Sequence, residues 1–164
     1  MSRKNKMRMT DVVHVYADAS YCSHTSAWGY GYCIKIGQPV MQRTHSGGGM
    51  HCMSSQYAEL VAVREALDFL RVHLKGILQD VVVEVRSDCL GALAGIKHDA
   101  EEFKTLTGVR RVDLLHVQSH ARGGDTHTVL NKLCDSLARQ AMKRYRARVH
   151  AAREAKRNRR KAHA

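Results

Sequence analysis

The order of the predicted strands and helices indicates a single α/β domain built on a mixed sheet. Short runs of β-branched and apolar residues predict strands, most clearly at residues 12–18 and 81–87. Apolar residues at helical spacing predict one helix after residue 54 and another after residue 129. The chain has 164 residues and 44% hydrophobic content, which suits one domain with one core.

The first three predicted strands form an antiparallel meander. The first occupies residues 12–18, and strands at 28–36 and 40–45 follow it. Residues 37–39, Gly-Gln-Pro, supply a turn between the second and third strands. The glycine-rich segment at 46–49 interrupts the strand pattern, so we expect the third strand to end before it.

A long amphipathic helix and a parallel strand come next. The apolar residues of the helix recur at intervals of three and four positions: Leu60, Val63, Leu67 and Leu70. Ser54 or Ser55 can cap its N-terminus. The apolar strand at 81–87 is reached through this helix, so it is expected to lie parallel to the first strand after a right-handed crossover.

The last third of the chain completes an order of βββαβαβα. A short helical segment at 90–96 and an acidic patch at 99–102 lead to a strand at 112–118 and a polar loop at 119–128. A final helix carries one apolar stripe: Leu130, Leu133, Leu137 and Ala141. No Pro or Gly follows Gly124, so this helix can continue into the C-terminal tail. The prediction is a five-stranded mixed sheet, three antiparallel strands then two parallel additions, flanked by helices.

Positive charge is concentrated at the two ends of the chain. The formal net charge is +12, and residues 139–164 hold 11 Lys and Arg against the single acid Glu154. Residues 1–8 add four Lys and Arg, whereas residues 9–138 carry 12 basic and 14 acidic residues. The central part is therefore nearly neutral, and the ends are cationic.

This uneven composition divides the chain into three parts. Residues 1–10 form a basic arm, residues 11–146 form the folded domain, and residues 147–164 form a basic tail that can extend the last helix. Basic ends suit a polyanion, so we expect the tail to contact nucleic-acid phosphates. A tail that only improves solubility is the alternative.

Cysteine usage and hydropathy restrict the cellular setting. The five cysteines are odd in number and show no C-x2-C spacing, which indicates neither a disulfide framework nor a zinc site. Residues 1–10 lack the apolar stretch of a signal peptide, and no segment approaches the ~18 consecutive apolar residues of a membrane span. We expect a soluble, monomeric, cytoplasmic protein that does not bind membranes.

Four acidic residues stand in otherwise apolar segments: Asp18, Glu59, Asp88 and Asp135. Asp18 and Asp88 lie at the C-terminal ends of strands, the edge where open α/β sheets bind ligands. Glu59 lies near a helix N-terminus, which favours its ionised form, and Asp135 follows Asn131 by four residues, on one helical face. If the fold brings the four together, their repulsion requires cations, and Mg2+ is the natural partner of such oxygen ligands.

These segments resemble the motifs of the ribonuclease H type 1 family, from about residue 12 to residue 141. Residues 16–20 read Tyr-Ala-Asp-Ala-Ser and resemble the first-strand motif of that family. Residues 56–60 resemble its helix motif, and Ser87 with Asp88 resembles its fourth-strand motif. The strongest match is Asn-Lys-Leu-Cys-Asp-Ser-Leu-Ala-Arg at 131–139, preceded by Val-Gln-Ser-His-Ala at 117–121.

The resemblance implies a ribonuclease H-like fold and hydrolysis of the RNA strand of an RNA/DNA hybrid by two metal ions. Two Mg2+ ions, or Mn2+ as a substitute, would activate a water and stabilise the leaving oxygen. By this resemblance Asp18 bridges both metals, Glu59 and Asp88 complete one metal site, and Asp135 belongs mainly to the other.

The resemblance also assigns a proton-transfer residue and a set of substrate contacts. His120 would help to deprotonate the nucleophile or release the product, with His127 in the same loop as its competitor. The residues expected to contact the hybrid are Ser20, Ser55, Gln56 and Asn131.

The chain departs from the family pattern in several respects, including a shorter Ser55 at the helix start and a longer loop at residues 120–131. Ala19 replaces the usual Gly beside the first Asp, which affects how closely the backbone approaches the RNA strand. Few cations lie between Asp88 and Val112, so the basic protrusion of some relatives is absent. The alternative functions are a structure-specific DNA nuclease of the same superfamily, such as a Holliday-junction resolvase, and a nucleic-acid-binding protein without activity.

Overall fold

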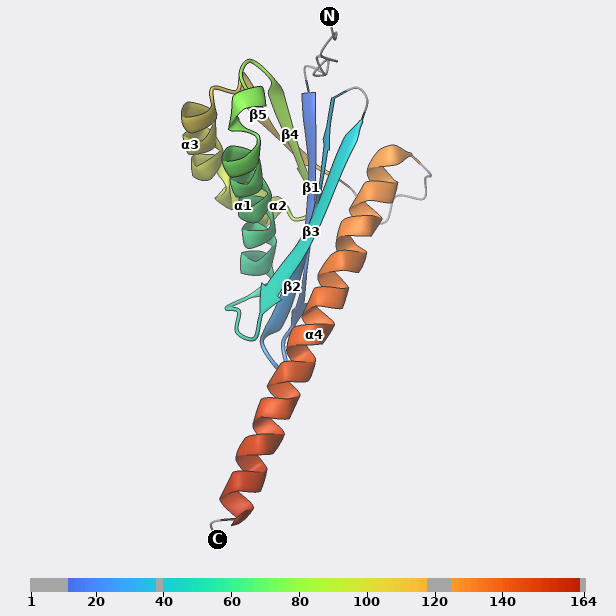
Figure 1. The fold of residues 1–164 in the computed structure, drawn as a ribbon, viewed down its shortest axis with the longest axis vertical. Helices are drawn as coiled ribbons and strands as arrows, with labels where there is room; N and C mark the ends of the chain where they lie inside the picture. Colours follow the sequence, from blue (N-terminus) through green and yellow to red (C-terminus); the bar gives the residue numbers. More distant parts are fainter. Residues whose placement is uncertain (1–11, 38–39, 118–124, 163–164) are drawn as a thin grey trace, which may run out of the picture.

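The computed structural model describes residues 12–37, 40–117 and 125–162, and it contains one five-stranded sheet (Figure 1). The strand order is β3-β2-β1-β4-β5. The strands are β1 (Val12–Cys22), β2 (Ala27–Ile36), β3 (Met41–Gly49), β4 (Val82–Ser87) and β5 (Arg111–His116). β1, β2 and β3 pair antiparallel, and β4 and β5 are added in parallel, as predicted from the sequence.

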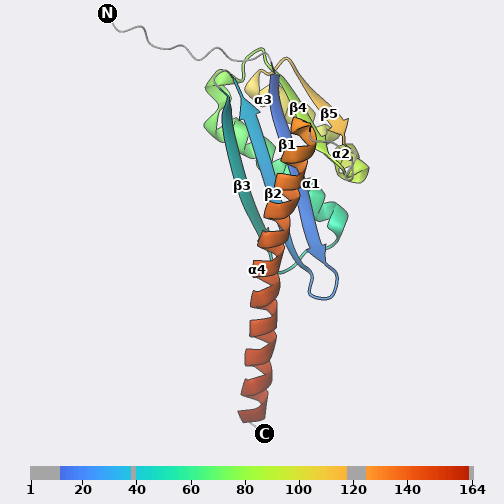
Figure 2. The same cartoon turned by 90° about the vertical axis from the view of Figure 1, so that its right-hand side faces the viewer.

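Helices cover both faces of this sheet (Figures 1 and 2). They are α1 (Ser55–His73), α2 (Leu90–Gly95), α3 (Lys97–Thr107) and α4 (Thr126–Ala162), with a 3-10 turn at Lys75–Ile77. α1 lies on one face of β1 and β2, and α4 lies on the other. Among the described residues, no helix is both long and apolar enough to cross a membrane.

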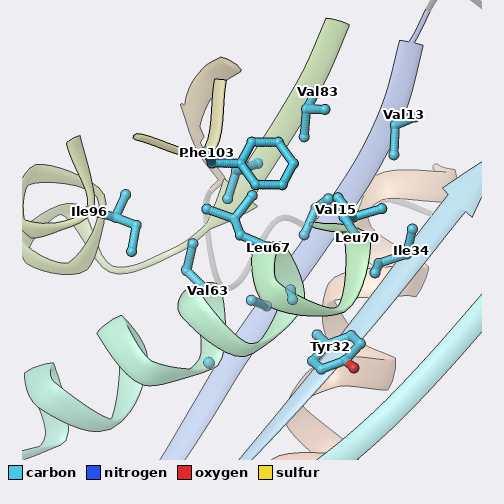
Figure 3. Packing of buried hydrophobic residues seen from close by; sticks show 14 of the residues in the cluster. Val13, Val15, Tyr32, Ile34, Val63, Leu67, Leu70, Val83, Ile96 and Phe103 are labelled. Atoms are coloured by element: carbon cyan, nitrogen blue, oxygen red, sulfur yellow. The ribbon is translucent and has the colours of Figure 1, made fainter. Parts of the chain in front are cut away.

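The main core lies between the sheet and α1 (Figure 3). Because side chains alternate along a strand, Val13, Val15 and Ala17 of β1 all point to this face. They pack against the predicted apolar stripe of α1, in which Val63 and Leu70 are completely buried. The helical spacing read from the sequence therefore identifies the buried face of α1 correctly.

On the opposite face, α4 lies unusually close to β2. A Cβ atom added to Gly31 would lie 2.6 Å from the carbonyl oxygen of Cys134 and 2.6 Å from Cβ of Leu137. A Cβ atom on Gly29 would overlap the backbone of Met142 and Ala138. Only glycine at these two positions allows the helix to rest on the strand backbone.

Three parts of the predicted elements were wrong. β1 continues past its predicted end at Asp18 to Cys22, where it still pairs with β2. β3 continues through Gly47, Gly48 and Gly49, whose partners on β2 include Trp28 and Tyr30. Gly47 lies against the Tyr30 ring and Gly49 against the Trp28 indole. The two aromatic rings therefore fill the space that side chains at these glycine positions would occupy. The acidic patch at 99–102 was not assigned to a helix, but it lies within α3.

The last helix agrees with the prediction and extends further than the packed domain. It begins at Thr126, so the last three residues of the predicted polar loop are helical, and it continues to Ala162. Val149 is its last buried residue, and every described residue after it is exposed. The end of α4 therefore projects from the domain, as Figures 1 and 2 show.

The close contact between α4 and β2 gives a stability prediction. Gly31→Ala should lower the free energy of unfolding by about 1–3 kcal/mol, because the new methyl group must displace helix backbone. Gly76→Ala is the matched control, since an added Cβ meets nothing within 4 Å there, and it should change stability by less than about 0.5 kcal/mol. Urea denaturation of both variants measures the difference, and equal stabilities would contradict the packing described.

Candidate active site

The register of two parallel strands brings Asp18 and Asp88 together. β1 and β4 pair Tyr16 with Arg86. Asp18 and Asp88 each lie two positions further along, so they follow the same face of the sheet, next to each other. The prediction that Asp18 ends its strand was wrong, because β1 continues to Cys22 and Asp18 pairs with Gly31 of β2. Asp88 does follow directly after β4, and the register still places it next to Asp18.

Glu59 reaches the same point from α1. Ser54 caps this helix, because its Oγ accepts a hydrogen bond of 3.1 Å from the backbone N–H of Tyr57. Glu59 follows just over one turn after the cap. Carboxylate oxygens of Asp18, Glu59 and Asp88 all lie within 4.8 Å of one another.

The second wall of the site is α4. A cleft of about 410 Å3 lies between it and the three carboxylates. The cleft is lined by Asp18, Ala19, Glu59, Asp88, Asn131, Lys132, Asp135 and Arg139. Asp135 forms an ion pair with Arg139 at 2.7 Å, and Asn131 is buried beside it. The four predicted acids therefore border one cleft.

Burial and mutual repulsion make two of these carboxylates hard to ionise without a cation. Burial, with repulsion from Asp88 and Asp135, raises the pKa of Asp18 to about 7. Burial, with repulsion from Asp18 and Asp88, raises the pKa of Glu59 to about 9. A bound cation would reverse both effects, because it stabilises the ionised forms.

The donor set fits a hard divalent cation. All the carboxylate ligands offered by Asp18, Glu59 and Asp88 are oxygens, which Mg2+ and Mn2+ prefer. Oε2 of Glu59 and Oδ1 of Asn131 are buried and have no hydrogen-bond partner among the described residues. Buried polar atoms are normally satisfied, so both oxygens are available to a ligand of the cleft.

The remaining predicted contacts lie outside this cleft. Ser20, Ser55 and Gln56 are not among its lining residues. Gln56 instead borders a separate hollow of about 260 Å3, where its side chain lies against Gly91. Because Ser55 and Gln56 are exposed at the start of α1, they can still contact a substrate that extends beyond the cleft.

Two cations of the cleft were not assigned a role from the sequence. Lys132 precedes Asp135 by three residues and Arg139 follows it by four, so all three share one side of α4. That spacing was the available signal. The signal was overlooked because only Asn131 and Asp135 of this segment were considered as site residues.

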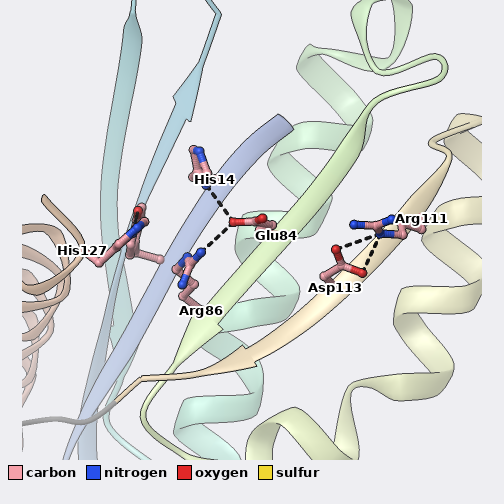
Figure 4. A network of polar contacts seen from close by, with 7 residues as sticks. His14, Glu84, Arg86, Arg111, Asp113 and His127 are labelled. Atoms are coloured by element: carbon pink, nitrogen blue, oxygen red, sulfur yellow. Dashed lines mark hydrogen bonds and ion pairs between the residues drawn. The ribbon is translucent and has the colours of Figure 1, made fainter. Parts of the chain in front are cut away.

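The two candidate histidines differ in what the structure describes. His120 lies outside the described residues. Nδ1 of His127 is 2.6 Å from the Tyr16 hydroxyl, and its ring centroid is 6.0 Å from that of His14, beside the Glu84 and Arg86 ion pair (Figure 4). Burial, and then the nearby Arg86, lower the pKa of His127. His127 is therefore held at the start of α4, and it does not line the cleft.

Comparisons with known proteins agree with the fold. Residues 10–143 match the model of the RNase H family. No curated protein sequence matches the chain.

Several solved structures share the fold at low identity. LC11-RNase H1, solved in complex with an RNA/DNA hybrid, has 16% identity and a TM-score of 0.63, covering 80% of this chain and 97% of its own. The N-terminal RNase H domain of a Mycobacterium tuberculosis protein has 18% identity and a TM-score of 0.54, covering 83% and 96%. RNase H1 of the halophilic archaeon Halobacterium salinarum has 21% identity and a TM-score of 0.52, covering 80% and 98%.

The family match spans most of the chain and includes all four acidic residues of the cleft. The five-stranded mixed sheet is also the fold of these RNase H structures. The chain therefore belongs to the ribonuclease H family of hydrolases.

Proposed function

We propose that this protein is a monomeric, cytoplasmic endoribonuclease that hydrolyses the RNA strand of RNA/DNA hybrids with two Mg2+ ions, or Mn2+ in their place. The observation that carries the proposal is the group of three carboxylates within 4.8 Å, on a ribonuclease H fold. The structure of LC11-RNase H1 with a hybrid supports this choice of substrate.

Each acidic residue has a role in this proposal. Asp18, Glu59 and Asp88 would hold one metal, and Asp135 together with Asp18 would hold the second. When bound, the metals activate the attacking water and stabilise the leaving oxygen. The ion pair with Arg139 fixes the carboxylate of Asp135 at the edge of the cleft, ready for a ligand.

Other residues of the cleft would position the hybrid. The buried Oδ1 of Asn131 lacks a partner among the described residues, so it can accept a hydrogen bond from the 2′-hydroxyl that distinguishes RNA from DNA. Lys132 is exposed at the rim and can neutralise a phosphate of the backbone. Ser20, Ser55 and Gln56 would contact the hybrid outside the cleft.

The two alternative functions fit the site less well. A junction resolvase would use similar carboxylates, but the family match and the segment at 131–139 favour a ribonuclease H. A protein without activity gains nothing from Asp18 and Glu59, because burying repelling carboxylates costs stability. Incubation with labelled hybrid, duplex DNA, duplex RNA and a four-way junction, with Mg2+ or EDTA, separates the three functions.

Replacement of a metal ligand should abolish turnover. Asp18→Asn and Asp88→Asn each remove a carboxylate ligand while keeping the size of the side chain, so cleavage of the hybrid should stop and the far-ultraviolet circular dichroism should not change. Glu101→Gln, an exposed acid on α3, is the control and should retain wild-type activity. Cleavage by Asp18→Asn or Asp88→Asn at the wild-type rate would overturn the assignment.

The two histidines should also behave differently. His120→Ala should slow turnover by roughly 10- to 1,000-fold, because a proton-transfer group is lost. His127→Ala should leave the turnover number near that of wild type, since His127 contacts Tyr16 and does not line the cleft. Single-turnover cleavage at saturating Mg2+ compares them, and a larger loss in His127→Ala would reverse the assignment.

The raised pKa values predict the pH dependence of stability in the metal-free protein. The folded state keeps protons on Asp18 up to about pH 7 and on Glu59 up to about pH 9, whereas the unfolded chain releases them near pH 4. The stabilisation is complete below the unfolded pKa values and is lost as the pH rises through the folded ones. Melting temperatures in EDTA should therefore fall between pH 5 and pH 9.

Two variants test the source of this effect. In Asp18→Asn the melting temperature should decrease less between pH 5 and pH 9, and it should be higher than that of wild type at pH 8, because the repulsion on Glu59 decreases. Glu101→Gln should follow wild type. Mg2+ should stabilise wild type more at pH 8 than at pH 6, since protons compete with the metal for the carboxylates. A wild-type melting temperature that rises with pH in EDTA would contradict the electrostatics of the site.

A further inference from the structure

The basic residues of α4 form a stripe that starts in the cleft. One basic residue occurs every seven positions along the helix: Lys132, Arg139, Arg146, Arg153 and Arg160. Seven residues correspond to almost two helical turns, so these five side chains share one side of α4. A second row lies beside the first and contains Lys143, His150 and Arg157, each four residues after a member of the first row. We call these eight residues the basic stripe.

Three hollows along α4 show that the stripe is continuous. Lys132 and Arg139 line the cleft with the carboxylates. Arg146 and Arg153 line the next hollow, of about 470 Å3, whose other wall is the turn between β1 and β2. Arg153 also borders a third hollow, together with Arg160. The stripe thus leads from the candidate active site along α4. Figure 1 shows the end of this helix projecting from the domain.

Few charges of the stripe have a partner among the described residues, and Arg146 contacts the thiol of Cys22. All eight side chains are exposed. Within the described part of the chain, Arg139 is the only one that forms an ion pair, and its partner is Asp135. Like charges three or four residues apart, as in Lys143 and Arg146, destabilise a helix by roughly 0.2–0.5 kcal/mol per pair. A polyanion laid along the stripe would remove this repulsion.

The helix dipole and the need for solubility account for only part of this arrangement. Cations in the last turn of a helix interact favourably with its dipole, but this effect ends within one turn. Solubility alone would not place the cations on the side that continues from the cleft. Arg144 and Arg148, away from the stripe, have contacts within the domain, with the Ser46 hydroxyl at 3.4 Å and the Tyr145 ring at 5.1 Å.

We propose that the basic stripe of α4 binds the phosphates of the nucleic-acid duplex on one side of the cut. This inference rests on the proposed function, and it adds a direction and a length to the substrate site. Lys132 and Arg160 are 28 positions apart, which corresponds to about 42 Å of helix at 1.5 Å per residue. At 3.4 Å per base pair, that length corresponds to roughly 12 base pairs. A duplex that occupies only the cleft cannot reach the end of the stripe.

The test compares two variants that lose the same charge from the same helix. The stripe variant carries Arg146→Gln, Arg153→Gln and Arg160→Gln. The control variant carries Arg144→Gln, Arg148→Gln and Arg159→Gln, three exposed positions away from the stripe. Glutamine is a good helix former, so both variants should keep α4. Circular dichroism and melting temperature verify this before any binding is measured.

Fluorescence anisotropy in EDTA then gives the dissociation constants for two hybrids over a series of salt concentrations. For a hybrid of about 20 base pairs, the stripe variant should lower the slope of log K against log salt by about 2.7, because each lost phosphate contact removes about 0.9. The control variant should lower it by less than about 1. A hybrid hairpin of about 6 base pairs spans about 20 Å, roughly half of the stripe, so the stripe variant should lower its slope by less than it does for the long hybrid.

Three outcomes would overturn the inference. They are equal slopes for the two variants on the long hybrid, an equal loss on both hybrids, and a stripe variant that loses binding only to phosphatidylserine vesicles. Cleavage by wild type is measured separately. If wild type does not cut the hybrid but the stripe variant shows the predicted loss, the proposed activity fails and the phosphate-binding stripe stands.

Discussion

The close packing of α4 on β2 is the contact on which the rest of this molecule depends. Gly29 and Gly31 remove the side chains that would hold the helix away from the strand. The buried surface that results joins Tyr16 and Cys33 to Cys134, whose thiol lies 3.4 Å from the backbone oxygen of Tyr16. Because α4 is held by backbone contact, it places Asp135 at the cleft and fixes the direction in which its free end leaves the domain.

The acidic site destabilises the fold that this packing stabilises. Asp18 is buried and Glu59 is partly buried, and their pKa values are raised because the carboxylates lack solvent and repel each other. Removing one charge would relieve the repulsion, whereas a divalent cation relieves it and keeps every ligand ionised. The metal-free domain therefore loses folding stability that a hydrophobic site would keep. A bound divalent cation would restore this stability, which is the electrostatic basis for binding metal.

Much of the fold and the acidic site could be predicted from the sequence, because both depend on local patterns. Alternation in β1 and helical spacing in α1 identify the buried faces. The parallel pairing of β1 with β4 places Asp18 next to Asp88, although Asp18 lies inside β1 and not at its end. The extension of β3 could not be predicted, because glycines have low strand propensity and are held there by the rings of Trp28 and Tyr30. The position of Gln56 beside Gly91 also depends on tertiary packing, and no local pattern indicates it.

The carboxylates of the cleft and the cations of α4 together determine how a polyanion can approach. Four carboxylates border the cleft, and two divalent cations would cancel their formal charge, which leaves little net attraction for a phosphate backbone. Arg139 is already paired with Asp135, so Lys132 is the one cation lining the cleft without an ion pair in the described residues. At physiological salt, charges act over about 8 Å. Attraction must therefore come from side chains that touch the duplex, and affinity should grow with the length of duplex that lies along α4.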